Sequence, residues 1–304
     1  MSRTLRYLVT GREGQVVQSL LEQGRRPQHA HLELIAMGRP DLDLMDPDSL
    51  HRAVETVAPD LVISAAAYTA VDQAEGDEGT AHRVKALGPQ ALGQAAARLK
   101  IPVVHLSTDY VFDGDKQTPY EESDPVGPVS AYGRTKLAGE QLLLEVLPNA
   151  VILRTAWVYS PFGKNFAKTM LRLAETHDRL GVVADQVGNP TSALDIAEGI
   201  LTVAGNLVGS SDPSLCGVFH MTGRGEASWA QFAEEILRVS AVHDGPTAEV
   251  GPLTTADYPT PARRPANSRL NNAALQAAHG VELPQWQAST QHVIERLVKN
   301  RAYL

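Results

Sequence analysis

The chain has 304 residues and a net charge of -8, and 43% of its residues are apolar, which is typical of a globular protein with one large domain or two closely packed ones. It has no basic stripe and no apolar run near the roughly 20 residues of a membrane span, so neither nucleic acid nor a membrane is an expected partner. Cys216 is the only cysteine and no segment resembles a signal peptide, so we expect a cytoplasmic protein without an intrachain disulfide. The ten histidines include no H-x-x-x-H pair, and we expect no metal site.

Short apolar segments alternate with amphipathic stretches through the first half of the chain. The apolar segments predict buried parallel strands at residues 5–10, 32–37, 60–66, 102–108 and 150–156. The stretches between them predict helices at residues 14–24, 46–60 and 80–100. Asp46 is the expected N-cap of the second helix, with Pro47 at its first position. This succession predicts an α/β fold with a Rossmann-type doubly wound parallel sheet.

The alternation weakens after about residue 158. Helices are predicted there at residues 165–177, 192–208, 228–239 and 284–301, and Ser228 is the expected cap of the third. The proline-rich segment 244–268 is expected to cover a surface. We expect a Rossmann domain of residues 1–157, rejoined by about 179–210, and a smaller C-terminal α/β substrate-binding domain formed by residues 158–178 and 211–304.

The segment VTGREGQVVQSL, residues 9–20, is close to a dinucleotide-binding fingerprint. Gly11 follows a predicted strand and Gly14 opens a predicted helix, which is the context that the fingerprint requires. The first glycine permits the tight turn, and the second lets backbone N–H groups approach a pyrophosphate at the helix N-terminus. The two glycines therefore predict a bound dinucleotide. Val17 stands where a third glycine would allow close helix packing, so we also expect a slightly displaced first helix. An ordinary strand-turn-helix remains an alternative.

The end of the second predicted strand bears on the choice of cofactor. Gly38 and Arg39 lie there, where an NAD-selective site usually carries an acid for the ribose 2′-hydroxyl. An arginine without that acid suits a 2′-phosphate, so Arg39 indicates NADPH. NADH stays an alternative cofactor, and Arg39 could equally be a surface residue.

A Tyr-x-x-x-Lys pair begins the helix predicted after the fourth strand. Tyr132 and Lys136 lie four residues apart, so a helix brings the phenol and the ammonium to one face. We expect the cation to lower the tyrosine pKa from its usual value of about 10, which would let Tyr132 transfer a proton near neutral pH. Thr108 lies at the carboxyl end of the preceding strand and supplies a hydroxyl.

These residues and seven longer segments, which follow one another in the order typical of a known family, carry a resemblance to that family. The segments are GREGQV, DLVISAAAYTAVDQAE, HLSTDYVFDG, PVSAYGRTKLAGE, ILRTAWVYSPFGKNFAKTMLRLA, DQVGNPTSALDIA and YPTPARRPANSRLN. The chain resembles the extended short-chain dehydrogenase/reductase family and, within it, the dTDP-4-dehydrorhamnose reductases. Val17 and Gly38 depart from that pattern: Val17 bears on the packing of the first helix and Gly38 on the choice of cofactor.

The resemblance implies NADPH-dependent reduction of the C4 keto group of dTDP-4-dehydro-6-deoxy-L-mannose, with hydride from NADPH and a proton from Tyr132. Thr108, Tyr132 and Lys136 would be the catalytic residues, and Lys136 would also hold the nicotinamide ribose. The other cofactor-binding residues implied are Gly11, Gly14, Gln15 and Val16 at the pyrophosphate, Asp43 and Leu44 at the adenine end, and Ala66, Ala67 and Tyr68 after the third strand. The nucleotide-sugar substrate would contact Thr108, Asp109, Trp157, Asn189, Arg264 and Asn267.

Two other functions stay open at this point. One is an epimerase or dehydratase that keeps NAD bound while it acts on a nucleotide sugar. The other is a non-catalytic, reductase-like regulatory subunit that acts by binding a partner. Thr108, Tyr132 and Lys136 favour catalysis. A homodimer stays open as an alternative to a monomer.

Overall fold

The computed structural model describes residues 3–66, 70–301 and 303, and a parallel sheet forms its centre. The sheet has six strands in the order β10-β5-β4-β3-β1-β2, and each neighbouring pair is parallel. The strands are β1 (Leu5–Thr10), β2 (Leu32–Met37), β3 (Leu61–Ser64), β4 (Val103–Thr108), β5 (Val151–Thr155) and β10 (Gly217–His220). The order reverses between β1 and β3, so the sheet is doubly wound, as predicted.

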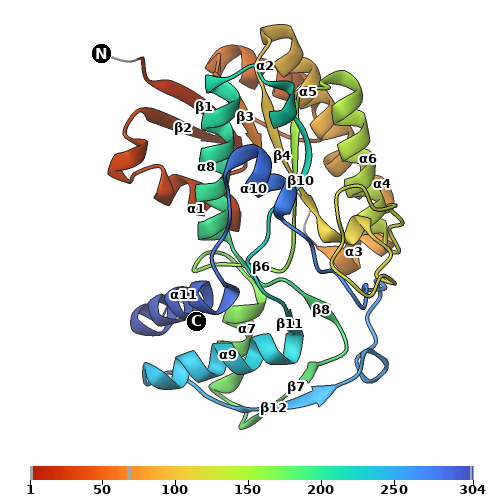
Figure 1. Ribbon diagram of the computed structural model, residues 1–304, viewed down its shortest axis with the longest axis vertical. Helices are drawn as coiled ribbons and strands as arrows, with labels where there is room; N and C mark the ends of the chain where they lie inside the picture. Colours follow the sequence, from red (N-terminus) through yellow and green to blue (C-terminus); the bar gives the residue numbers. More distant parts are fainter. Residues whose placement is uncertain (1–2, 67–69, 302, 304) are drawn as a thin grey trace.

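Helices cover both faces of this sheet (Figure 1). On one face α1 (Gln15–Gln23) packs against α8 (Ala193–Gly209), and on the other α5 (Gly88–Leu99) packs against α2 (Pro47–Val57) and α6 (Ala131–Val146). Alternate strand residues enter the two layers, because successive side chains of a strand point to opposite faces. Val9 joins the core under α1 and α8, whereas Leu8 joins the core under α2, α5 and α6.

Local sequence explains most of these helices, with one exception. Asp46 caps α2 by accepting a hydrogen bond from the Asp48 amide at 3.0 Å, and Pro47 occupies the first turn, as predicted. The stretch 80–100, predicted as one helix, is divided into α4 (Glu78–His82), a π-helix (Arg83–Leu87) and α5. Pro89 lies in the first turn of α5 and has no amide hydrogen to continue a regular helical ladder.

A second, smaller unit lies below the sheet in Figure 1. Its helices α7 (Phe166–Ala174), α9 (Trp229–Val242) and α11 (Trp286–Asn300) share one hydrophobic core. Ser228 caps α9 in a reciprocal arrangement with Gln231. The remaining helices and paired strands are α3 (Val71–Gly76), α10 (Ala273–His279), β7 (Arg179–Val183) with β12 (Glu249–Leu253), β6 (Val158–Tyr159) with β9 (Thr191–Ser192), and β8 (Val187–Gly188) with β11 (Ala227–Ser228).

The chain returns to the sheet in a segment that differs from the one expected. Strand β7 pairs with β12 in the smaller unit, whereas α8 packs on α1 and β10 extends the sheet beside β5. The returning segment is therefore 193–220, where 179–210 was expected, and the division into two domains stays a prediction. Within the described ranges, no helix is both long and apolar enough to cross a membrane.

Candidate active site

The carboxyl ends of four parallel strands meet at one edge of the sheet. Strands β1 and β3 flank the point where the strand order reverses, and β4 and β5 lie beside them. In open α/β sheets, ligands bind outside the carboxyl ends of the strands at this point. Thr10 joins two of these ends, because its Oγ1 accepts hydrogen bonds from the amides of Ala65 and Ala66, each at 3.0 Å.

The glycine loop after β1 leaves the N-terminus of α1 open. Gly11 has a φ of +102°, a conformation that favours glycine, and Gly14 is the N-cap of α1 without a side-chain cap. The amides of this first turn are therefore available to an anion. Val17 is 1% exposed, and its Cγ2 would lie 3.2 Å from a Cβ placed on Gly11. The valine thus packs directly below the loop, and displacement of the helix stays a prediction.

Three adjoining cavities follow the strand ends. The first, of about 570 Å³, lies between the loop and the end of β2. The second, of about 500 Å³, extends from the loop to the start of α6, and the third, of about 380 Å³, continues into the smaller unit. The first two share Gly11 and Ala66, and the last two share Gln15 and Tyr132. Together they form a continuous groove.

Most predicted cofactor residues line this groove. The first cavity is lined by Gly11, Arg39, Asp43, Leu44 and Ala66, and the second by Gly11, Gly14, Gln15, Val16, Ala66, Tyr132 and Lys136. Ala67 and Tyr68 lie outside the described residues. Arg12 is a further lining residue of the first cavity that sequence reasoning missed, and its guanidinium is 2.5 Å from Asp41 Oδ2. The open helix N-terminus and the two arginines fit a dinucleotide with an additional phosphate.

Thr108 and Tyr132 meet where the second and third cavities join. Thr108 ends β4, and its Oγ1 donates a hydrogen bond to Asp109 Oδ1 at 2.9 Å. Tyr132 lies in the first turn of α6, which Ser130 caps by accepting a hydrogen bond from the Gly133 amide. Burial raises the pKa of Tyr132 to about 12, and the Asp109 carboxylate acts in the same direction, whereas a hydrogen bond with Thr108 opposes them. The phenol therefore keeps its proton at neutral pH.

Lys136 lies on the same helix but is directed toward β4. Its Nζ donates a hydrogen bond to the Leu106 carbonyl oxygen at 2.5 Å and lies 3.1 Å from His105 Nε2. Burial lowers the pKa of Lys136 to about 8. The expectation that Lys136 lowers the tyrosine pKa is corrected here, because burial dominates and the pKa of Tyr132 is raised. His105 is buried and directly contacts this lysine.

The third cavity joins residues from both units. Asp109, Trp157 and Arg264, three of the predicted substrate residues, line it. Trp157 has a φ of +46°, and its ring stacks on Trp229 with 3.6 Å between centroids. Trp229 also lines the cavity. Sequence reasoning does not single it out, because nothing in a single sequence pairs two distant tryptophans.

Two predicted substrate residues are occupied elsewhere. Asn189 donates to the Gly225 carbonyl oxygen at 2.7 Å and accepts from the Leu270 amide at 2.8 Å, and it lines none of the three cavities. Asn267 donates to the Lys116 carbonyl oxygen at 2.6 Å and is likewise outside the three linings. Both amides hold loops in place, and their contact with a substrate stays a prediction.

A doubly wound sheet, an open glycine loop and a threonine beside Tyr-x-x-x-Lys define a nucleotide-dependent oxidoreductase of the short-chain dehydrogenase/reductase class. Within that class the chain belongs to the family described as RmlD substrate binding domain, which it matches over residues 5–299. It is 48% identical over 294 residues to dTDP-4-dehydrorhamnose reductase from Sinorhizobium fredii, a match that covers 97% of this chain and 98% of the relative.

Solved structures of similarly named proteins have the same fold. A dTDP-4-dehydrorhamnose reductase from Clostridium acetobutylicum superposes with a TM-score of 0.88 at 38% identity, covering 96% of this chain and 99% of that one. The dTDP-4-dehydrorhamnose reductase of Bacillus anthracis, solved in complex with NADP, also gives a TM-score of 0.88, at 31% identity and the same coverage.

Proposed function

We propose that this protein is an NADPH-dependent oxidoreductase that reduces the C4 keto group of dTDP-4-dehydro-6-deoxy-L-mannose to give dTDP-L-rhamnose. The observation that carries the proposal is the position of Tyr132, whose side chain lines both the cofactor-sized cavity and the cavity of the smaller unit. A proton donor at that junction can serve a carbonyl placed between the two cavities. The relatives' names supply the sugar nucleotide and the position of its keto group.

The chemistry that a bound reduced nicotinamide supplies is hydride transfer to the carbonyl carbon. Tyr132 donates its phenolic proton to the carbonyl oxygen as negative charge develops there, and the resulting phenolate is reprotonated from solvent. Thr108 hydrogen-bonds to the same oxygen and stabilises the developing charge. Because the phenol is protonated at neutral pH, Tyr132 begins the reaction in the form that an acid requires. Lys136, which lines the second cavity, would hold the nicotinamide ribose.

The direct test incubates the protein with dTDP-4-dehydro-6-deoxy-L-mannose and follows NADPH absorbance. One NADPH should be consumed for each sugar reduced. An epimerase or dehydratase that keeps its NAD would form product without net consumption of NADPH. A folded protein that neither consumes NADPH nor converts the sugar would match the regulatory-subunit alternative.

The preference for NADPH rests on the two arginines of the first cavity. Arg12 and Arg39 are the cations that would face a 2′-phosphate. Because a hydrogen bond to a charged group contributes about 1.5–3 kcal/mol, Arg39→Ala should raise the KM for NADPH about 10- to 100-fold and leave that for NADH nearly unchanged. Equal or better use of NADH by the wild type would contradict this assignment. The homodimer stays a prediction that light scattering can check.

A further inference from the structure

A buried lysine that no part of the proposed mechanism uses lies against the ring of Tyr132. Lys85 belongs to the π-helix Arg83–Leu87, and its Nζ is 4.0 Å from the centroid of the Tyr132 ring. The residue is 1% exposed. An ammonium over an aromatic face is attracted by the ring quadrupole, and the attraction grows when the pair is shielded from water.

The backbone around Lys85 holds this contact in place. A Cβ on Gly139 of α6 would overlap the Lys85 carbonyl oxygen, so the glycine allows the π-helix and α6 to touch. Single-turn π-helices are frequent at functional sites, because the extra residue redirects a side chain. Lys136 is engaged by β4, so the cation that lies over the Tyr132 ring is Lys85.

We propose that Lys85 is a positioning residue for Tyr132: its ammonium fixes the orientation of the ring and stabilises the negative charge that the phenol acquires when it gives up its proton. The inference rests on the proposed function, in which Tyr132 is the acid. Lys85 lines none of the three cavities and acts only through the tyrosine.

The charge of Lys85 depends on its surroundings. Burial lowers the pKa of Lys85 to about 7, the Lys136 ammonium of α6 adds to that effect, and the Glu75 carboxylate of α3 opposes it. Glu75 is itself fixed, because its Oε1 accepts a hydrogen bond from the Ala131 amide at 2.7 Å. Lys85 is therefore charged below about pH 7 and loses its charge above it.

The described elements packed around the π-helix carry other charged side chains. Helix α4, which packs on the π-helix, carries His82 and Glu78, and Glu78 is paired with Arg134 of α6 at 2.9 Å. Asp109 acts on the pKa of Tyr132 from the side of β4. The charge over the ring should therefore follow the titration of Lys85.

The test compares kcat of the wild type and Lys85→Met across pH, at saturating NADPH and with whichever 4-keto sugar the wild type reduces. Below about pH 6.5, where Lys85 is charged, the methionine variant should be slower by about tenfold, with an unchanged KM for NADPH. The ratio of the two rates should shrink as pH rises through about 7, because the wild type then loses the same charge. A residue with only a structural role would give a ratio independent of pH.

Two further variants test whether the effect depends on the charge of Lys85. Lys85→Arg keeps its charge throughout, so it should retain activity and lose less of it than the wild type above about pH 7. Lys168→Met, on α7 and outside the three cavity linings, is the matched control and should behave as the wild type. If Lys85→Met does not fold, the pH dependence of kcat for Lys85→Arg, compared with that of the wild type, still tests the proposal. A methionine variant within twofold of wild-type kcat at low pH, or a loss that is constant across pH, overturns the proposal. Turnover by the wild type tests the proposed function separately.

Discussion

The hydroxyl and the ring of Tyr132 have different contacts in this site. The hydroxyl forms a hydrogen bond with Thr108, whereas the ring contacts Lys85 and packs edge-on against Tyr110 at 5.9 Å between centroids. A change that removes only the oxygen should therefore leave the packing of the ring intact.

Tyr132→Phe should lower kcat by about 10²- to 10⁴-fold, the usual contribution of a general acid, with little change in the affinity for NADPH. The measurement is steady-state turnover beside a fluorescence titration of the cofactor. Near-normal turnover would show that another group supplies the proton. A large loss of cofactor affinity would instead point to a misfolded groove.

The protonation of Asp109 makes the free energy of unfolding of the protein depend on pH. Its side chain is 3% exposed, and burial raises the pKa to about 7. Between about pH 4 and 7 the folded state holds a proton that the unfolded state has released, so this residue's contribution to the free energy of unfolding falls as pH rises, by about 1.4 kcal/mol per pH unit at most.

Asp109→Asn removes that titration and keeps an oxygen to accept the Thr108 hydroxyl. The free energy of unfolding of the variant, relative to the wild type, should therefore increase steadily from about pH 4 to 7 in urea titrations. Parallel stability curves for the two proteins would mean that Asp109 is ionised throughout this range.

The sequence predicted those site residues whose neighbours are close to them along the chain. Thr108, Tyr132 and Lys136 could be proposed from the sequence because a strand end and a helical spacing of four fix their neighbours. Lys85 and Arg12 were missed, because each acts on a residue that is distant in sequence or on a cavity formed by several loops. The hydrogen bonds of Asn189 to Gly225 and Leu270 could not be foreseen, since these partners are brought to it only by the folded chain.

At the scale of elements, α6 is the helix on which the site depends. It carries Tyr132 and Lys136 on the side that faces β4 and the π-helix, and the close approach requires Gly139. Gly205 lies in the middle of α8, and a Cβ placed there would meet no atom of the described residues within 4 Å. The two helical glycines therefore form a matched pair with opposite expectations.

Gly139→Ala should lower the free energy of unfolding by about 1–3 kcal/mol, because the new methyl group overlaps backbone and the two helices must separate. Activity should fall as well, since the separation moves Lys85 and Tyr132. Gly205→Ala should raise stability by about 0.5–1 kcal/mol and leave turnover unchanged, as in an open helix position. Thermal and urea unfolding measure both. Equal effects at the two positions would contradict the packing described here.

The sequence predicted long elements better than short ones. Each buried strand of the first half is an apolar run between turn residues, and that pattern is enough to predict a strand. The two-residue strands β6, β8, β9 and β11 have no such pattern, since they exist only through pairing between distant segments. The π-helix also escaped prediction, because amphipathic periodicity does not distinguish it from the helices on either side.

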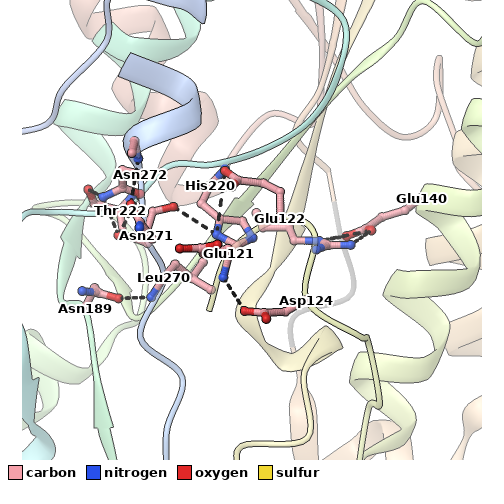
Figure 2. A network of polar contacts seen from close by, with 12 residues as sticks. Glu121, Glu122, Asp124, Glu140, Asn189, His220, Thr222, Leu270, Asn271 and Asn272 are labelled. Carbon is pink, nitrogen blue, oxygen red and sulfur yellow. Dashed lines mark hydrogen bonds and ion pairs between the residues drawn. The ribbon is translucent and has the colours of Figure 1, made fainter. Parts of the chain in front are cut away.

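At the scale of the whole molecule, polar contacts connect the sheet to the loops that carry Glu122 and Asn271. Figure 2 shows three neighbouring sets of contacts: those of Glu140, those of His220 with Glu122, and those of Asn272 with Thr222. His220 lies on β10, where its amide donates to Glu122 Oε1 at 2.8 Å and its Nδ1 lies 3.2 Å from the Asn271 carbonyl oxygen. Burial, with the charge of Arg154, lowers the pKa of His220 to about 3, so this histidine is neutral and donates from Nδ1.

The Arg154–Glu140 pair joins β5 to α6 among these contacts. Its Nη2 donates to Glu140 Oε2 at 2.7 Å, and both residues are almost fully buried, at 4% and 2% exposed. The guanidinium also lies over the Phe112 ring, with Cζ 5.1 Å from its centroid. A buried charge without its partner is costly, whereas replacing both charges by apolar groups is often neutral.

A double-mutant cycle separates those two effects. Arg154→Met should lower the free energy of unfolding by about 3–5 kcal/mol because Glu140 is left buried and unpaired, and adding Glu140→Leu should recover most of that loss. The exposed pair Arg238–Glu235 on α9 is the control, and Arg238→Ala should change stability by less than about 1 kcal/mol. Because salt screens buried pairs weakly, the coupling at Arg154 should persist in about 1 M salt while any effect at Arg238 disappears. If the double variant is as unstable as the sum of its singles, the pair acts through hydrogen bonds to the surrounding loops, and α6 is held to the sheet by packing alone.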